Sequence, residues 1–96
     1  MENVKLERAI DELGRIVLPK EFRKHLSLWD DEPVELKVSD TGEIAISKIN
    51  ANVIVEIDEV GRISLPQSWC VKYGYNAGDT LDVWVENDVM KLSRHS

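Results

Sequence analysis

Two pairs of neighbouring acids are the residues of this sequence whose types could do chemistry. Asp11-Glu12 and Asp58-Glu59 are adjacent carboxylates of the kind that serve as general acids and bases or bind a divalent cation. Such chemistry needs partners, and no nucleophile, paired histidine or glycine-rich phosphate loop accompanies these acids. An aspartate beside a turn more often accepts hydrogen bonds from local backbone N–H groups. We therefore expect turn-stabilising acids, no catalytic residue and no enzyme.

Sulfur and imidazole groups are too few in this chain for a structural metal site. Cys70 is the single cysteine, so no internal disulfide is expected, as in a reducing compartment. His25 and His95 add two nitrogen ligands, whereas a structural zinc ion usually takes four ligands that are mostly thiolates and imidazoles. Cys70 itself is more typical of a small buried hydrophobic residue than of a reactive thiol. We expect no metal ion and no cofactor.

Basic side chains gather in the first half of the chain. The cluster falls within seventeen positions and comprises Arg8, Arg15, Lys20, Arg23 and Lys24. Cations concentrated on one face are what binding to nucleic-acid phosphates requires. The net charge of -6 argues against such binding for the molecule as a whole. Because the acids concentrate elsewhere, at 30–35 and in later loops, a local basic face on an acidic protein is expected.

The chain is a tandem repeat. Residues 10–19, IDELGRIVLP, align with residues 57–66, IDEVGRISLP, with eight identities in ten positions at an offset of 47. The same offset matches Phe22 with Trp69 and Leu26 with Tyr73, and the alternating apolar residues of 34–38 with those of 81–85. Only residues 49–52 separate the copies, which is too short for a flexible linker. The copies are therefore expected to pack closely.

Each copy predicts the same order of elements. A first strand (4–10; 53–57) and a short second strand flank a turn whose glycine suits positive φ, and these strands read as a hairpin. Pro19 and Pro66 fit the first position of a helix of about two turns. Gly74 fits the exit of the second helix. Two alternating strands follow, across 34–48 and 81–94, with turns at 39–42 and 87–88. The pattern is ββαββ, twice.

Length and composition limit the organisation of the chain. With 43% hydrophobic and 31% charged residues the chain is expected to fold rather than remain disordered. A unit of about 45 residues buries too little surface alone, so we expect one domain, 1–96, made of a first repeat (4–49) and a second repeat (50–96). No apolar run approaches the roughly 20 residues that span a bilayer, and no signal peptide is evident. We expect a soluble cytoplasmic protein without membrane contact.

The segment LERAIDELGRIVLPKEFRKHL resembles the AbrB-like swapped-hairpin domains (SpoVT-AbrB, MazE and MraZ) of bacterial and archaeal transcription regulators. The resemblance covers the first copy throughout, and the second through DEVGRISLP and 77–81, where Gly78-Asp79 is similar to the family's turn before the third strand. In the first copy Asp31-Glu32 stands there, a departure from the family's pattern. The resemblance implies a mainly β fold with two short helices, in which two ββαββ units interleave their hairpins into a pseudo-twofold barrel, here within one chain.

The same resemblance implies binding to double-stranded DNA through cations of the first hairpin and the helix. The matching positions, with the second-copy equivalent of Arg15, are Arg8, Arg15, Arg23, Lys24 and Arg62. Lys24 departs from the family's arginine, so a bidentate base contact is not implied there. Because Arg15 and Arg62 occupy equivalent places, they could straddle a duplex as a matched pair.

Each of these cations also has a structural interpretation. An arginine beside a turn is commonly a solvated charge. Arg8 shares a strand face with Leu6 and Ile10 while its equivalent is Val55, so it either twists outward or extends over the edge of the core. Arg23 and Lys24 lie on the helix face away from Phe22 and Leu26, as on any amphipathic helix.

The second copy has diverged on its helix. Cys70 and Val71 replace Arg23 and Lys24, so this face is either covered by another chain or copy or exposes a small apolar patch. Trp29, Trp69 and Trp84 suit core or rim packing, although Trp84 shares the outward parity of Asp82 and Glu86, which also suits an interface. A homodimer or higher oligomer would restore the symmetry that this divergence removes.

Two other functions fit the same fold. An antitoxin or another protein-interaction module is the alternative, since relatives of this fold serve that way, but such antitoxins usually carry a toxin-binding tail and this sequence ends at Ser96 soon after the last strand. We therefore expect duplex DNA, rather than a toxin, as the partner. A purely oligomerising module is the third interpretation, and it predicts that Arg15→Ala leaves every activity intact.

Overall fold

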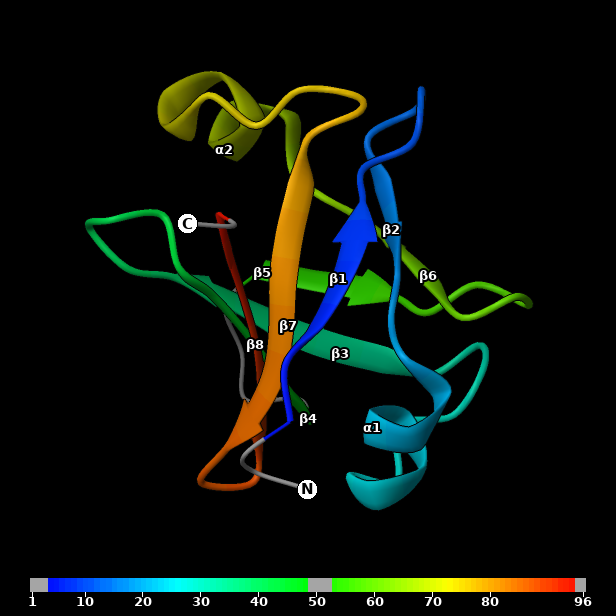
Figure 1. Ribbon diagram of the computed structural model, residues 1–96. Coiled ribbons are helices and arrows are strands. Elements are labelled where there is room, and N and C mark those ends of the chain that lie inside the picture. Colours follow the sequence, from blue (N-terminus) through cyan, green and yellow to red (C-terminus); the bar gives the residue numbers. More distant parts are fainter. Residues whose placement is uncertain (1–3, 49–52, 95–96) are drawn as a thin grey trace.

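The predicted order of elements is present in both halves. A computed structural model describes residues 4–48 and 53–94 (Figure 1). In chain order the elements are β1 (Leu6–Ala9), β2 (Arg15–Val17), α1 (Lys20–His25), β3 (Pro33–Val38), β4 (Ile44–Lys48), β5 (Val53–Glu56), β6 (Arg62–Ser64), α2 (Gln67–Tyr73), β7 (Thr80–Glu86) and β8 (Val89–Arg94). The fold is mainly β with two short helices, in two ββαββ units. Neither helix described is long and apolar enough to cross a membrane.

Strand pairing interleaves the two halves. The larger sheet has the order β1-β7-β8-β4-β3-β5, and β2 and β6 form a separate two-stranded sheet, hereafter the ribbon. Thus β1 of the first half pairs with β7 of the second, and β5 of the second half pairs with β3 of the first. Figure 1 shows β1 beside β7 and β2 crossing beside β6. Each half therefore supplies an edge strand to the other.

Two details of the predicted barrel were wrong. The first two strands of a half do not pair with each other, because each forms its backbone hydrogen bonds with a strand of the other half: β1 with β7, and β2 with β6. The hydrogen-bonded ring is also not closed: among the strands described, the larger sheet ends at β1 and β5. The ribbon instead covers the core by side-chain packing, since Ile16 and Ile63 belong to the same buried cluster as the residues of the larger sheet.

The registers locate a pseudo-twofold axis. In the ribbon, Ile16 pairs with Ile63, its own equivalent at the offset of 47. Across the centre of the larger sheet, Ala45 pairs with Lys91, its equivalent after the one-residue difference in the turn. A residue can pair with its own equivalent only where the symmetry axis passes between them. The axis therefore crosses the ribbon at its middle and leaves the molecule between β4 and β8.

The core follows the predicted alternation. On β7 the inward side chains of Leu81, Val83 and Val85 are buried, and those of Asp82 and Trp84 are half-buried on the outer face. On the inner face of the ribbon and just beyond it, Ile16, Leu18, Ile63 and Leu65 are buried as expected. This alternation with period two is what places the charged residues of the ribbon on the outside.

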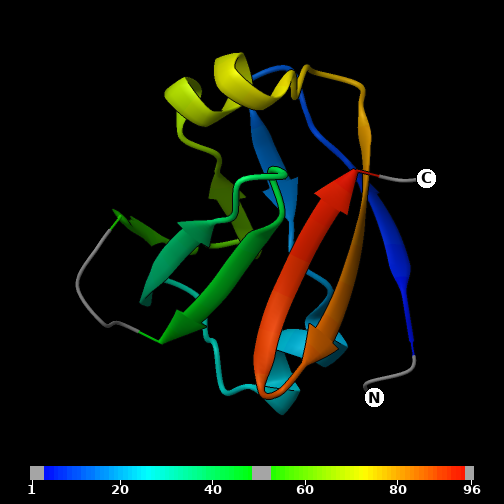
Figure 2. The same cartoon turned by 90° about the vertical axis from the view of Figure 1, so that its left-hand side faces the viewer.

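The helices are held at opposite ends of the molecule, as Figures 1 and 2 both show. Pro19 and Pro66 stand one position earlier than predicted, as N-caps. Phe22 is buried, and Leu26, Trp69 and Tyr73 pack partly buried against the core. Gly74 ends α2 in the left-handed conformation, as predicted.

The departure at Asp31 does not change the turn before β3. Asp31 has φ 63° where Gly78 has φ 89°. The Asp31 N–H donates to Ile57 O at 2.7 Å, and the Gly78 N–H donates to Ile10 O at the same distance. Aspartate is one of the few residues that tolerates this conformation. The two turns are therefore equivalent in backbone geometry although their sequences differ.

Candidate nucleic-acid interface

The outer face of the ribbon carries two arginines related by the pseudo-twofold axis. Arg15 stands opposite Ser64, and Arg62 stands opposite Val17. Because Ile16 and Ile63 point into the core, these four residues share the outward face. Arg15 and Arg62 are diagonal neighbours across the axis, with about 7–8 Å expected between such positions. The ribbon therefore presents two guanidinium groups side by side on one surface.

Each of these arginines is oriented by the aspartate of its own turn. Arg15 Nε donates to Asp11 Oδ2 at 2.8 Å, and Arg62 Nε donates to Asp58 Oδ2 at 2.7 Å. The hydrogen bonds use Nε alone, and the Nη groups make none with the residues that the structure describes. The geometry fixes the direction of each side chain and leaves its terminal nitrogens available to an external anion.

The two aspartates also hold the turns. Asp11 Oδ1 accepts from the backbone N–H groups of Leu13 and Arg15, and Asp58 Oδ1 does the same in its turn. The backbone hydrogen bond from Arg15, together with its side-chain bond, lowers the pKa of Asp11. Partial burial opposes the shift at Asp58, but the hydrogen bonds from Arg62 outweigh it and lower the pKa of that carboxyl too. The prediction of turn-stabilising acids is confirmed.

Arg23 is a structural link and does not lie on the predicted exposed face. Its side chain is only 13% exposed. Nε donates to Leu18 O at 3.2 Å, and Nη1 pairs with Asp30 Oδ1 at 2.8 Å. The guanidinium covers Gly61 of the β5–β6 turn so closely that a Cβ there would stand 2.6 Å from Nη2. The amphipathic pattern missed this contact because the surface that covers Arg23 comes from the other half of the chain.

Lys24 is exposed as predicted, and it has two neighbours that the prediction did not include. Lys20 and Trp29, the latter 50% exposed, line with Lys24 a shallow hollow of about 410 Å³ at the end of α1. We call this surface the α1 end. Lys20 belongs to the cationic cluster of the sequence, and Trp29 differs from its equivalent Asn76, so a comparison of the copies could have indicated both.

Arg8 lies apart from the ribbon, on the edge strand β1 opposite Leu81. It is half-buried, as is Val55 at the equivalent position. Its Nη1 donates to the carbonyl oxygen of Glu7 at 2.8 Å. This position matches the expectation of a side chain that extends over the edge of the core. The structure therefore does not group Arg8 with Arg15 and Arg62.

The other tryptophans are accounted for by packing. Trp69 packs against the core from α2. Trp84 lies on the outer face of β7, where Lys5 Nζ stands 4.9 Å from the ring centroid and the indole N–H donates to Glu86 at 3.2 Å. This indole hydrogen bond, followed by the charge of Lys91, lowers the pKa of Glu86. Trp84 is thus part of a surface cluster on the face away from the ribbon.

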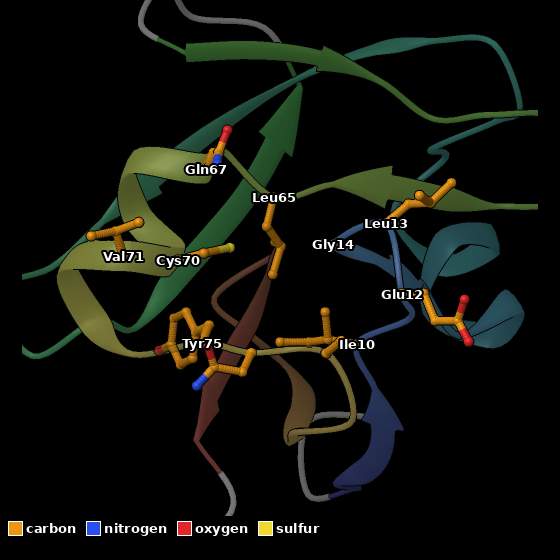
Figure 3. A pocket seen from close by; sticks show the side chains of 11 residues that line it. Ile10, Glu12, Leu13, Gly14, Leu65, Gln67, Cys70, Val71 and Tyr75 are labelled. Atoms are coloured by element: carbon orange, nitrogen blue, oxygen red, sulfur yellow. The ribbon is translucent and has the colours of Figure 1, made fainter.

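The opposite end of the molecule lacks the arginine link. Between α2 and the β1–β2 turn lies a hollow of about 470 Å³, and we call this surface the α2 end. Figure 3 shows Gln67, Cys70 and Val71 on one side of it and Glu12, Leu13 and Gly14 on the other. Cys70 stands where the first half has Arg23. A Cβ atom added to Gly14 would have no neighbouring atom within 4 Å among the described residues. The hollow is the space that the guanidinium fills at the α1 end.

Two exposed apolar side chains line this hollow, together with polar ones such as Glu12 and Gln67. Val71 is 78% exposed and Leu13 72% exposed, so the diverged face of the second helix forms an exposed patch within this chain. Cys70 is half-buried, and burial raises the pKa of its thiol. No group of three or more His, Cys, Asp or Glu side chains that could hold a metal ion lies in the part of the chain that the structure describes.

Comparisons with known proteins agree with this architecture. Residues 8–53 match the family described as antidote-toxin recognition MazE, bacterial antitoxin. Over 48 residues the chain is 40% identical to stage V sporulation protein T of Bacillus subtilis (strain 168), covering 50% of this chain and 27% of that protein. The sequence of residues 8–53 is thus MazE/AbrB-like, which confirms the predicted resemblance for this segment.

Two further similarities extend this result. Over 57 residues the chain is 32% identical to the transition state regulatory protein AbrB of the same organism, covering 59% of this chain and 58% of that protein. The chain spans less than two thirds of the length of either Bacillus relative. The solution structure of PHS018 from Pyrococcus horikoshii superposes with a TM-score of 0.58 over 95% of this chain and 89% of that one. At 18% identity this similarity concerns the fold.

Proposed function

We propose that this protein is a cytoplasmic DNA-binding transcription regulator that contacts duplex DNA with the outer face of the ribbon and the α1 end. The observation that carries the proposal is the pair Arg15 and Arg62, oriented side by side on one outward surface by their own aspartates. A two-stranded antiparallel ribbon is narrow enough to enter the major groove of B-DNA. Arginines placed on it reach phosphates at the groove edges or acceptors of guanine.

The α1 end extends this surface. Lys20 and Lys24 are exposed on α1, which follows strand β2 of the ribbon in the chain. Leu18, just before this helix, donates its N–H to the carbonyl oxygen of Gly61, the residue before Arg62, at 2.9 Å. Flexible lysines suit phosphates rather than bases. Within the proposal Arg23 has an indirect role: it holds the β5–β6 turn, and thereby Arg62, against α1. Arg8 contacts DNA only if the duplex reaches past the ribbon to β1. The proposed role requires no catalytic step and no cofactor.

The direct test is binding of the full chain to duplex DNA across a series of salt concentrations. For a protein that contacts about four phosphates, the logarithm of the affinity falls with the logarithm of salt with a slope of about -3.6. Arg15→Gln and Arg62→Gln should each lower the affinity and reduce the slope by about one if the side chain contacts a phosphate. Lys48→Gln removes the same charge from an exposed position on β4 and serves as the matched control.

Retained folding of each variant is checked by circular dichroism. The proposal is overturned if the wild-type chain does not bind duplex DNA at low salt, or if Lys48→Gln weakens binding as much as Arg15→Gln does.

A protein-interaction module such as an antitoxin is the second candidate, because the α2 end exposes Leu13 and Val71 around an open hollow. Here the partner would be a protein that covers this apolar patch. A toxin-like reading frame beside the gene, whose product forms a complex with this chain that Val71→Lys breaks, would favour it. Unchanged DNA binding by Val71→Ser, which shortens the apolar side chain without adding a cation, would show that the two surfaces act separately.

A further inference from the structure

We propose that one chain recognises an asymmetric DNA site: a symmetric centre read by the ribbon, and phosphate contacts that continue on one side only, beyond the α1 end. The inference rests on the proposed DNA binding and adds the class of site. A protein with true twofold symmetry meets palindromic DNA because both half-sites face identical surfaces. Here the backbone is nearly symmetric and the side chains are not.

The centre of the proposed interface is equal on both sides of the axis. The axis passes between Ile16 and Ile63, and Arg15 and Arg62 stand on either side of it with nearly identical bonds to Asp11 and Asp58. Their pairing distances differ by only 0.1 Å. A duplex centred on the ribbon therefore meets the same two guanidinium groups when it is rotated by half a turn.

The ends of the interface are unequal. At the α1 end the three helix positions that line the hollow are Lys20, Arg23 and Lys24. At the α2 end the equivalent positions are Gln67, Cys70 and Val71. Each cation of the first helix face is thus replaced by an uncharged side chain in the second, and the α2 end offers nothing to neutralise a phosphate at these positions.

Three other charges belong to this comparison, and one of them is the acid Glu21 of α1, which stands where α2 has Ser68. Lys72 is a cation of α2, but it does not line the hollow, and it stands 5.4 Å from the Tyr73 ring centroid. Asp30 neutralises Arg23 at the α1 end, and its equivalent Ala77 carries no charge. The free cations of the helix face that lines the hollow are therefore Lys20 and Lys24 at one end and none among the described residues at the other.

The two helix faces lie on opposite sides of the ribbon, so a bound duplex would meet different side chains on its two flanks. Arg62 lies at the α1 side of the ribbon, and Arg15 lies at the other side, where it lines a hollow with Ala77 and Gly78. The helices occupy opposite ends of the molecule (Figures 1 and 2). A duplex that runs along the ribbon therefore passes Lys20 and Lys24 on one flank and the uncharged Gln67 and Val71 on the other.

The test compares variants that exchange the two ends. Lys20→Gln with Lys24→Val gives the α1 end the side chains of α2, and Gln67→Lys with Val71→Lys does the reverse. The DNA is a duplex selected by the wild-type chain from a random-sequence library, and each protein is footprinted with hydroxyl radicals at a stoichiometry of one chain per duplex. Lys72→Gln is the control, because it removes a cation of α2 that lies off the hollow.

The wild-type footprint should extend further on one side of the centre, and the selected sequence should be palindromic only at its middle. Lys20→Gln with Lys24→Val should shorten the long side and reduce the salt slope by about 1.8, since each phosphate that is no longer neutralised accounts for about 0.9. Gln67→Lys with Val71→Lys should lengthen the short side and increase the slope by the same amount. Lys72→Gln should leave the footprint and the slope unchanged.

Three results would overturn the inference, and they differ in what they say about DNA binding. A wild-type footprint that is symmetric about the centre, with DNA binding intact, overturns the asymmetry and leaves the proposed function standing. Absence of binding to any selected duplex at low salt overturns both. Equal slopes for the wild type and the two exchanged variants would show that the helix lysines contact no phosphate, which also overturns the inference.

Discussion

The guanidinium of Arg23 in the first half lies directly over Gly61 in the second half. It is anchored there by Leu18 O and Asp30. The equivalent contact, between residue 70 and Gly14, does not exist, because a cysteine replaces the arginine. One substitution within the repeat thus leaves Gly61 covered by a guanidinium group and Gly14 open, in a molecule whose backbone is nearly symmetric.

Replacing the two turn glycines by alanine should have unequal effects. Both have positive φ, so each substitution should lower the free energy of unfolding by about 1–2 kcal/mol. Gly61→Ala should cost about 1–2 kcal/mol more than Gly14→Ala, because the new methyl group displaces Arg23 from its charged hydrogen bonds. Urea denaturation measures both. In an Arg23→Ala background the two costs should become equal, and a persistent difference would contradict the proposed contact.

Introducing an arginine–aspartate pair like Arg23–Asp30 at the equivalent positions of the second half should stabilise the protein. Cys70→Arg with Ala77→Asp introduces the pair that Arg23 and Asp30 form in the first half, next to Leu65 O and the open face of Gly14. An increase of about 1 kcal/mol in the free energy of unfolding would raise the melting temperature by about 4–8 °C in a domain of this size. Cys70→Arg alone is the control and should gain less, since the introduced cation lacks its acid. A lower melting temperature for the double variant would argue against equivalence of the two ends.

The turn before β3 should tolerate glycine well. Asp31→Gly places a residue without a Cβ at φ 63° and should raise the free energy of unfolding by about 0.5–1 kcal/mol. Gly78→Asp is the reciprocal change and should lower it by a similar amount, because the same backbone conformation is then imposed on aspartate. Thermal unfolding of the pair of variants decides the matter, and a destabilising Asp31→Gly would mean that the Asp31 side chain contributes an interaction of its own.

Lowering the pH should weaken the two turns that precede the strands of the ribbon. The pKa values of Asp11 and Asp58 lie below the ordinary 3.8 in the folded protein, because both carboxylates accept hydrogen bonds. Their stabilising effect is therefore complete above about pH 5 and is lost as the pH falls through the lowered folded-state values. Asp11→Asn with Asp58→Asn should unfold at lower urea concentration than the wild type at pH 6, and the difference should shrink at pH 2.5. A difference that is constant with pH would exclude a contribution from the carboxylate charges.

The first half alone should not fold as a monomer. β1 has its partner β7 in the second half, and β3 pairs with β5, so residues 1–49 by themselves leave both strands without these partners. At high concentration two such fragments can exchange these strands and dimerise, which analytical ultracentrifugation and circular dichroism over a dilution series would detect. A folded monomeric fragment at micromolar concentration would show that interleaving is not required.

Much of this architecture is evident in the sequence itself. The duplicated IDELGRIVLP segment, the alternation on β7 and the glycine at position 74 predict the elements and their ends, because they depend on backbone conformation and on which face of a strand is apolar. The same local signals identify Arg15 and Arg62 as an equivalent pair beside turns. These features are encoded within a few residues of where they act.

Contacts between the halves were decided by the tertiary structure. The sequence shows Arg23 on the polar side of a short helix, but Gly61, which lies beneath it, is 38 positions away. The pairing of β1 with β7 and the failure of the sheet to close depend on which strand offers its backbone groups to which, and every strand here could pair in more than one way. Local patterning thus determined the two repeats, and long-range packing decided that Gly61 is covered by Arg23 while Gly14 is left open.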